Sequence, residues 1–105
     1  MANPLAGEVA IVIDGERRIC KLTLGALAEL EAELGEESLL ALIERFESGA
    51  YKARDVLAIV AAGLRGGGWE GTRSDFLRLD VGGGVEEAAR VAAKLLVGAF
   101  APFEG

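Results

Sequence analysis

The chain has no histidine and a single cysteine, Cys20, among its 105 residues. These are the side chains most often used for nucleophilic attack, proton transfer and zinc binding. Catalysis by carboxylates would need paired acids in one pocket, and the acids here fall mostly where helix surfaces are expected. We therefore expect no catalytic residue, no metal ligand and no cofactor. A lone cysteine excludes an internal disulfide, and we expect Cys20 to be a small core residue.

Basic residues and long apolar runs are also scarce. Eleven Lys and Arg against seventeen Asp and Glu give a formal net charge of −6, and the longest basic run is Arg17-Arg18. Such a surface repels nucleic-acid backbones and anionic lipids, so neither nucleic acid nor membrane is expected as a partner. No apolar run approaches the ~20 residues of a membrane-spanning helix. The residues "MANPLAGEVA" have neither a basic region nor an apolar core, so we expect no secretory signal and a cytoplasmic protein.

What is present predicts one globular domain over residues 1–105, since 51% of the chain is hydrophobic and 27% is charged. Residues 8–22 predict a β-hairpin, because Asp14-Gly15 favours a two-residue type I′ turn. This register places one set of side chains on the core face: Val9, Ile11, Ile13, Cys20 and Leu22. The opposite face carries Ala10, Val12 and Ile19. The outer edges of the hairpin stay unpaired unless another chain covers them.

The remaining pattern predicts helices over about 24–34, 38–48, 53–65, 73–79 and 85–100. Thr23 and Ser38 are good N-caps, whereas Lys52 is a weak cap that Asp55 partly compensates. The helix over 53–65 is the most apolar and is expected at the centre. The expected inward residues are Leu24, Leu27, Leu30 and Leu34, then Leu39, Leu42, Ile43 and Phe46, then Phe76, Leu77 and Leu79, and finally Val85, Ala89, Ala92, Leu95, Leu96 and Phe100. The fold class is thus α+β and mostly helical, with the hairpin packed on the helices.

Two glycine clusters, 66–68 and 82–84, raise the question of a phosphate-binding loop. The first cluster follows a helix, no Gly-Lys-Ser or Gly-Lys-Thr occurs, and the helix after the second opens with Glu86 and Glu87, which would repel a phosphate. We interpret both clusters as helix ends and hinges. The segment around Phe76 between them is then free to move off a groove formed by the third and last helices.

Five residues are candidates for binding a protein partner: Val12, Ile19, Trp69, Phe76 and Leu77. Trp69 has two interpretations, a loop anchor folded over the core or a binding hot spot. The acidic run Glu29, Glu31, Glu33, Glu36 and Glu37 is interpreted as a solvated face, because its spacing splays the carboxylates around a helix. Recognition of a basic partner is the second interpretation of this run.

Several blocks of sequence together resemble a known family: "MANPLAGEV", "KLTLGALAELEAELG", "LIERFESG", "ARDVLAIVAAGLRGGG" and "LLVGAF". They are similar to the small proteins of gene transfer agents and related tailed phages that are labelled tail tube proteins and grouped with tail assembly chaperones. The resemblance runs from the N-terminus to about Phe100. It implies a non-enzymatic role in tail building in a bacterial host. There the chaperone coats the tape-measure protein until tube subunits polymerise around it, and the tail tube protein is the other implied partner.

Three alternatives stay open. The chain could be a structural tail tube component, although tube subunits are usually larger β-sandwich proteins. It could be an unrelated adaptor that binds a strand at the hairpin edge, or a small hydrolase or nucleotide-dependent enzyme. Whether the protein forms a homo-oligomer is also open.

Overall fold

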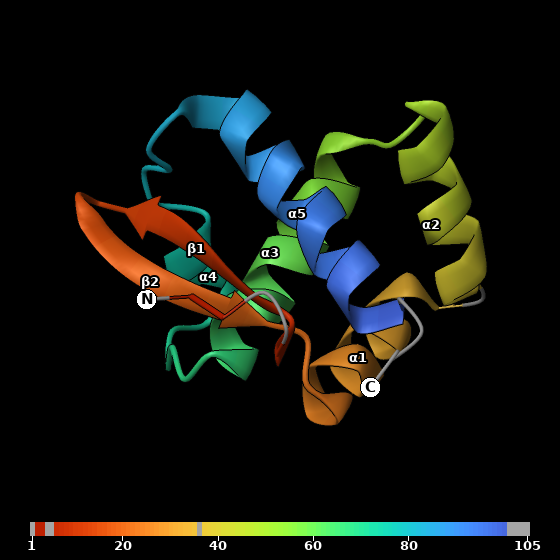
Figure 1. Cartoon of the computed structure of the whole chain (residues 1–105), viewed down its shortest axis with the longest axis horizontal. Helices are drawn as coiled ribbons and strands as arrows, with labels where there is room; N and C mark the ends of the chain where they lie inside the picture. Colours follow the sequence, from red (N-terminus) through yellow and green to blue (C-terminus); the bar gives the residue numbers. More distant parts are fainter. Residues whose placement is uncertain (1, 4–5, 36, 101–105) are drawn as a thin grey trace.

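Two strands and five helices make up the described part of the chain, residues 2–3, 6–35 and 37–100 of the computed structural model. The elements are β1 (Glu8–Ile13), β2 (Glu16–Lys21), α1 (Leu24–Leu34), α2 (Leu39–Ser48), α3 (Ala53–Gly66), α4 (Arg73–Phe76) and α5 (Gly84–Phe100). Figure 1 shows α5 crossing over α3, with the hairpin on one side of this pair and α2 on the other. The expected α+β, mostly helical class is confirmed.

The hairpin has the register that its turn predicts. Ile13 pairs with Glu16 and Val9 pairs with Cys20 in an antiparallel ladder. Asp14 and Gly15 adopt positive φ angles of 50° and 81°, as a type I′ turn requires. As a result Ile11, Ile13, Cys20 and Leu22 are buried on the core face, while Val12 is exposed on the other face.

Helix caps also form where the sequence places them. The hydroxyl oxygen of Thr23 accepts a hydrogen bond from the Ala26 N–H, and that of Ser38 accepts one from the Ala41 N–H, both at 3.1 Å. Gly49 ends α2 in the left-handed conformation, which glycine adopts without steric cost. Each of these bonds spans only a few residues, so local sequence is enough to specify it.

The predicted central position of α3 is confirmed. This helix packs on β2, α1 and α5, and α5 also packs on β1. Its buried residues include several small ones, Ala58, Ala61, Ala62 and Gly63, which allow close approach. A Cβ added at Gly63 would lie 2.7 Å from the Leu95 Cδ1 atom of α5 and 3.2 Å from the Cys20 Cβ atom of β2. The two neighbours therefore meet at this point of α3.

Three residues near helix ends that were expected to face inward are exposed instead. Leu24 is 86% exposed, Val85 is 79% exposed, and Phe100 is also exposed, whereas Ala26 and Val91 are buried. Leu24 and Phe100 are the terminal residues of α1 and α5, and Val85 is the second residue of α5. At such positions a helix extends past the element on which it packs, so an apolar residue in phase with the stripe has nothing to cover it.

The short helix α4 ends at Phe76, three residues before the expected end at 79. Thr72 and Asp75 cap it reciprocally, since each side chain accepts a hydrogen bond from the other residue's N–H, at 3.1 and 2.8 Å. Turn bonds then follow, including Leu79 N–H to the Phe76 carbonyl at 3.0 Å. The chain leaves the helix here because residues 80–82 pair with β1.

Candidate functional site

The first glycine cluster closes the outer edge of β2. A Cβ added at Gly66 would stand 1.9 Å from the Lys21 carbonyl oxygen, and one at Gly67 would stand 1.8 Å from the Ile19 carbonyl oxygen. The end of α3 therefore lies backbone against backbone on this strand, which only glycine permits. The cluster does end the helix, as expected. The expected hinge is wrong at Gly66 and Gly67, because this contact holds both residues against β2.

Residues 80–82 occupy the outer edge of β1. The Asp14 N–H donates to the Asp80 carbonyl at 2.8 Å and the Gly82 N–H donates to the Val12 carbonyl at 2.9 Å, so that Ile13 and Val81 form an antiparallel bridge. The Asp80 N–H also donates to the Asp14 carboxylate at 2.9 Å. The expectation that the outer edge of β1 stays unpaired without a second chain is thus wrong at these residues. At Ile19 and Lys21 the end of α3 covers the outer edge of β2.

An apolar groove of about 330 Å³ lies between the first half of α3, the segment 76–81 and the start of α5. We call it the α3–α5 groove. Among the described residues that line it, Asp80 is the one with a charge, and the others are Ala53, Val56, Leu57, Val60, Phe76, Leu79, Val81, Gly84, Val85 and Ala88. A groove between the third and last helices, bordered by the Phe76 segment, is therefore present where the sequence predicts it.

The five predicted partner-binding residues are split between the core and two surfaces. Phe76 is 4% exposed, as its expected inward position requires, and it also lines the groove; its role in binding a partner stays a prediction. Trp69 is half-buried against the core and packs edge-on to Phe76 at 6.3 Å between ring centroids, which agrees with a loop anchor. Leu77 is 60% exposed beside them, so its expected inward position is wrong. Val12 and the half-buried Ile19 lie on the outer face of the hairpin.

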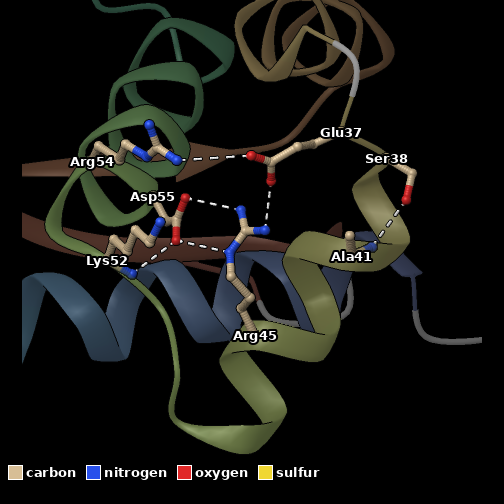
Figure 2. A network of polar contacts seen from close by, with 7 residues as sticks. All are labelled: Glu37, Ser38, Ala41, Arg45, Lys52, Arg54 and Asp55. Atoms are coloured by element: carbon tan, nitrogen blue, oxygen red, sulfur yellow. Dashed lines mark hydrogen bonds and ion pairs between the residues drawn. The ribbon is translucent and has the colours of Figure 1, made fainter.

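A polar network that was not predictable from the sequence joins α2 to α3. The Arg45 guanidinium donates to both carboxylate oxygens of Asp55, at 3.1 and 3.0 Å, and to the Glu37 carboxylate at 2.5 Å. Asp55 also accepts a hydrogen bond from the Lys52 N–H at 2.8 Å (Figure 2). Asp55 is thus the partner that compensates for the weak cap. An aspartate near the start of a helix after a poor cap was the available signal, but nothing local indicated Arg45.

The electrostatics of Asp55 follow from this geometry, since its side chain is only 3% exposed. Burial alone would raise the pKa of Asp55, but the hydrogen bonds from Arg45 and Lys52, with the charges of Arg45 and Arg54, lower this pKa below its usual value. Hydrogen bonds to Asp55 and Glu37 raise the pKa of Arg45. The network is therefore a charged, fully formed structural contact.

The acidic run is partly used inside the molecule. Glu29 pairs with Arg65 of α3, and Glu37 pairs with Arg45 and, at 3.8 Å, with Arg54. Glu36 lies outside the described residues. Part of the expected solvated face therefore consists of ion pairs at the edge of the helix packing.

Few side chains among the described residues are placed to make or break covalent bonds. No group of three or more His, Cys, Asp and Glu among them is placed to hold a metal ion. Cys20 is buried, and this burial raises the pKa of its thiol to about 12, so the thiolate needed for reactivity is absent at neutral pH. The α3–α5 groove, by contrast, is lined mainly by apolar side chains.

Within residues 2–3, 6–35 and 37–100, every helix is too short or too polar to cross a membrane.

Comparison with protein families gives one match that covers nearly the whole chain. The model of the family described as "Phage tail tube protein, GTA-gp10" matches residues 6–102. Searches of curated proteins and of solved structures gave no significant match. The family match agrees with the resemblance carried by the sequence blocks, and it spans the hairpin, the α3–α5 groove and the Arg45 network. The chain therefore belongs to the phage tail tube protein family of gene transfer agents.

Proposed function

We propose that this protein is a tail-assembly chaperone that holds apolar helical segments of the tape-measure protein until tail tube subunits assemble around them. The role is non-enzymatic and is exercised in the cytoplasm of the bacterial host. Membership of a phage tail family supports it, and the absence of histidine from the sequence agrees with it.

The α3–α5 groove is the observation that carries this proposal. Its walls are almost entirely apolar, and Val85 at its border is largely exposed. Leu77, which follows the groove residue Phe76, is exposed as well. Exposed apolar side chains beside an apolar groove are typical of surfaces that bind an amphipathic helix through residues spaced three and four apart. A tape-measure protein, long and helical, presents such spacing repeatedly.

The charge of the chain supports a holding role in a second way. A net charge of −6 keeps the protein soluble while its apolar groove is open to solvent. The same charge favours apolar segments flanked by Lys or Arg. A soluble acidic domain with an apolar groove can therefore cover an aggregation-prone segment without itself aggregating.

A structural tail tube component is the second candidate, because the family description names a tube protein. Tube walls are usually built from many strands that close a ring. In the described part of this chain, the sheet has two strands and one added bridge. Electron microscopy of the purified protein separates the candidates. Hollow tubes or stacked rings would support the tube component, and discrete particles would support the chaperone.

The binding test uses co-expression of the chain with a tape-measure protein of a gene transfer agent, followed by affinity purification. We expect the native chain to retain the tape-measure protein in the soluble fraction. Val85→Ser and Leu77→Ser are expected to lower the recovered amount, because they replace an apolar residue of the groove lining and the exposed apolar neighbour of Phe76 by a polar residue. Leu24→Ser is the matched control, since Leu24 is an equally exposed apolar residue on α1, away from the groove. No recovery with the native chain, or equal losses with all three variants, would refute the proposal.

A further inference from the structure

We propose that residues 80–82 form a strand-edge latch, which must release β1 before the α3–α5 groove admits a partner helix. The inference rests on the proposed function and adds the regulation of the same groove. It follows from one juxtaposition: the short segment that adds to the edge of β1 is also a wall of the groove.

The double role is visible in the contacts of this segment. Leu79, Asp80 and Val81 line the groove. On its other side the same segment forms the bridge between Val81 and Ile13 and the backbone bonds to Val12 and Asp14. Moving this segment off β1 therefore widens the groove, and holding it on β1 keeps the groove narrow.

The closed groove is small for its proposed occupant. Its volume of about 330 Å³ is at the lower end of the ~300–1,000 Å³ of ordinary small-molecule pockets. A helix with its side chains is about 10 Å across, and its apolar face presents several side chains at once. Entry of such a helix requires one wall to move. The wall made of Leu79 and Val81 is the shortest of the three and lies outside the helices.

The limits of the movement are set by the residues on either side. Phe76 is buried and packs against Trp69, so the N-terminal boundary of the mobile segment lies after it. Gly83 and Gly84 have φ angles of 87° and 70°, and a Cβ added at Gly84 would meet nothing within 4 Å. These two glycines provide the flexible boundary before α5. The moving part is thus residues 77–83, shorter than the whole segment between the glycine clusters.

Residues 80–82 are attached to β1 by few hydrogen bonds, and this attachment is exposed to solvent. Three hydrogen bonds between described residues hold it, and the Asp14 side of this attachment is exposed at the tip of the hairpin. Hydrogen bonds at an exposed sheet edge open far more often than those of a buried ladder. The latch is therefore able to open while the rest of the fold stays closed.

Thiol labelling tests the latch without any partner. Val60 is fully buried in the groove lining, so Val60→Cys in a Cys20→Ala chain reports groove opening through its rate of reaction with Ellman's reagent. Asp14→Gly removes the acceptor of the Asp80 N–H and keeps a residue suited to the positive φ of the turn. Asp14→Asn, the matched control, keeps both the acceptor and the turn. We expect labelling about fivefold faster with Asp14→Gly, which corresponds to the loss of one hydrogen bond, and an unchanged rate with Asp14→Asn.

Labelling of Cys20 in the native chain and in its Asp14→Gly variant reports opening of the whole fold, because this thiol lies in the core under β1 and β2. We expect Cys20 to react much more slowly than Val60→Cys, because the latch opens without opening of the whole fold. Equal labelling rates for the two Asp14 variants in the Val60→Cys chain, or labelling of Cys20 as fast as that of Val60→Cys, would overturn the latch.

A disulfide lock tests the link to binding. Ile13 and Val81 face each other in an antiparallel bridge, a geometry that accepts a disulfide. The chain with Ile13→Cys, Val81→Cys and Cys20→Ala is compared with itself, oxidised and reduced. We expect the oxidised form to bind the tape-measure protein at least about tenfold more weakly, since a closed groove lowers the binding-competent fraction. Equal binding by both forms would overturn the latch. Failure of the native chain to bind would refute the proposed function, and the labelling rates would still decide on the latch.

Discussion

The Arg45 guanidinium of α2 donates to both carboxylate oxygens of Asp55 of α3, and this bidentate ion pair connects a peripheral helix to the central one. The helix α2 does not belong to the closely packed pairs of elements, which involve β1, β2, α1, α3 and α5. Within α2 Leu42 is fully buried. The position of α2 therefore depends on Leu42, on the partly buried Leu39, Ile43 and Phe46, and on one bidentate ion pair whose acid is almost completely buried.

Breaking this pair is expected to cost stability. Asp55→Asn removes the negative charge and one of the strong acceptors of Arg45, and we expect the free energy of unfolding in urea to fall by about 2 kcal/mol. Arg54→Gln is the control, because its ion pair with Glu37 is longer and more exposed, and such a pair contributes about 0–1 kcal/mol. Equal losses in the two variants would contradict the structural role of the bidentate ion pair.

The same pair makes stability depend on pH in the acid range. The pKa of Asp55 is lower in the folded chain than its ordinary value, which is about 3.9. Its stabilisation is therefore complete above that value and is lost as the pH falls through the lower, folded pKa. We expect the difference in unfolding free energy between the native chain and Asp55→Asn to shrink as the pH falls from about 4 toward the lower, folded pKa. A difference that stays constant over this range would contradict the assignment.

Because the first glycine cluster lies in close contact with β2, we expect the addition of one methyl group there to lower the stability of the fold strongly. The Cβ of Gly67→Ala would stand 1.8 Å from the Ile19 carbonyl oxygen, so either α3 or β2 must shift. We expect a loss of about 3 kcal/mol in thermal or urea unfolding. Gly25→Ala is the matched control on α1, where the nearest atom lies at 3.9 Å, and it is expected to gain about 0.5–1 kcal/mol from helix propensity. A tolerated Gly67→Ala would mean that the two backbones do not meet.

Phe76 and Leu77 are neighbours in sequence with opposite expected effects. Phe76→Ala removes a buried ring and is expected to cost about 3 kcal/mol. It should also change the fluorescence of Trp69, the single tryptophan, which packs against that ring. Leu77→Ala removes an exposed side chain, and we expect a change within about 0.5 kcal/mol with unaltered fluorescence. Similar losses from both substitutions would show that Leu77 is also part of the core.

Features set by neighbouring residues were predictable from the sequence. The hairpin register follows from Asp14-Gly15, and the helix starts follow from Thr23 and Ser38, because the bonds concerned join residues at most a few positions apart. The central place of α3 follows from its apolar residues on more than one face. The groove between α3 and α5 was predicted for the same reason, as both helices carry apolar surface that must be buried or shared.

Contacts between distant segments were not predictable in this way. The Arg45–Asp55 pair, the closing of β2 by Gly66 and Gly67, and the pairing of residues 80–82 with β1 each join separate elements. Glycines in a sequence indicate that the backbone is free to turn, but they do not say whether that freedom serves a hinge or a close approach. The burial of Phe76 beside an exposed Leu77 likewise depends on where a four-residue helix is placed on the core.

The amino-acid sequence by itself determined the hairpin, the limits of the main helices and the absence of histidine chemistry, because these depend on short-range hydrogen bonds, residue periodicity and composition. The tertiary structure alone decided which apolar residues stay exposed, how both hairpin edges are closed and where the α3–α5 groove can open. The physical reason is that steric fit and burial depend on atoms brought together from far apart in the chain.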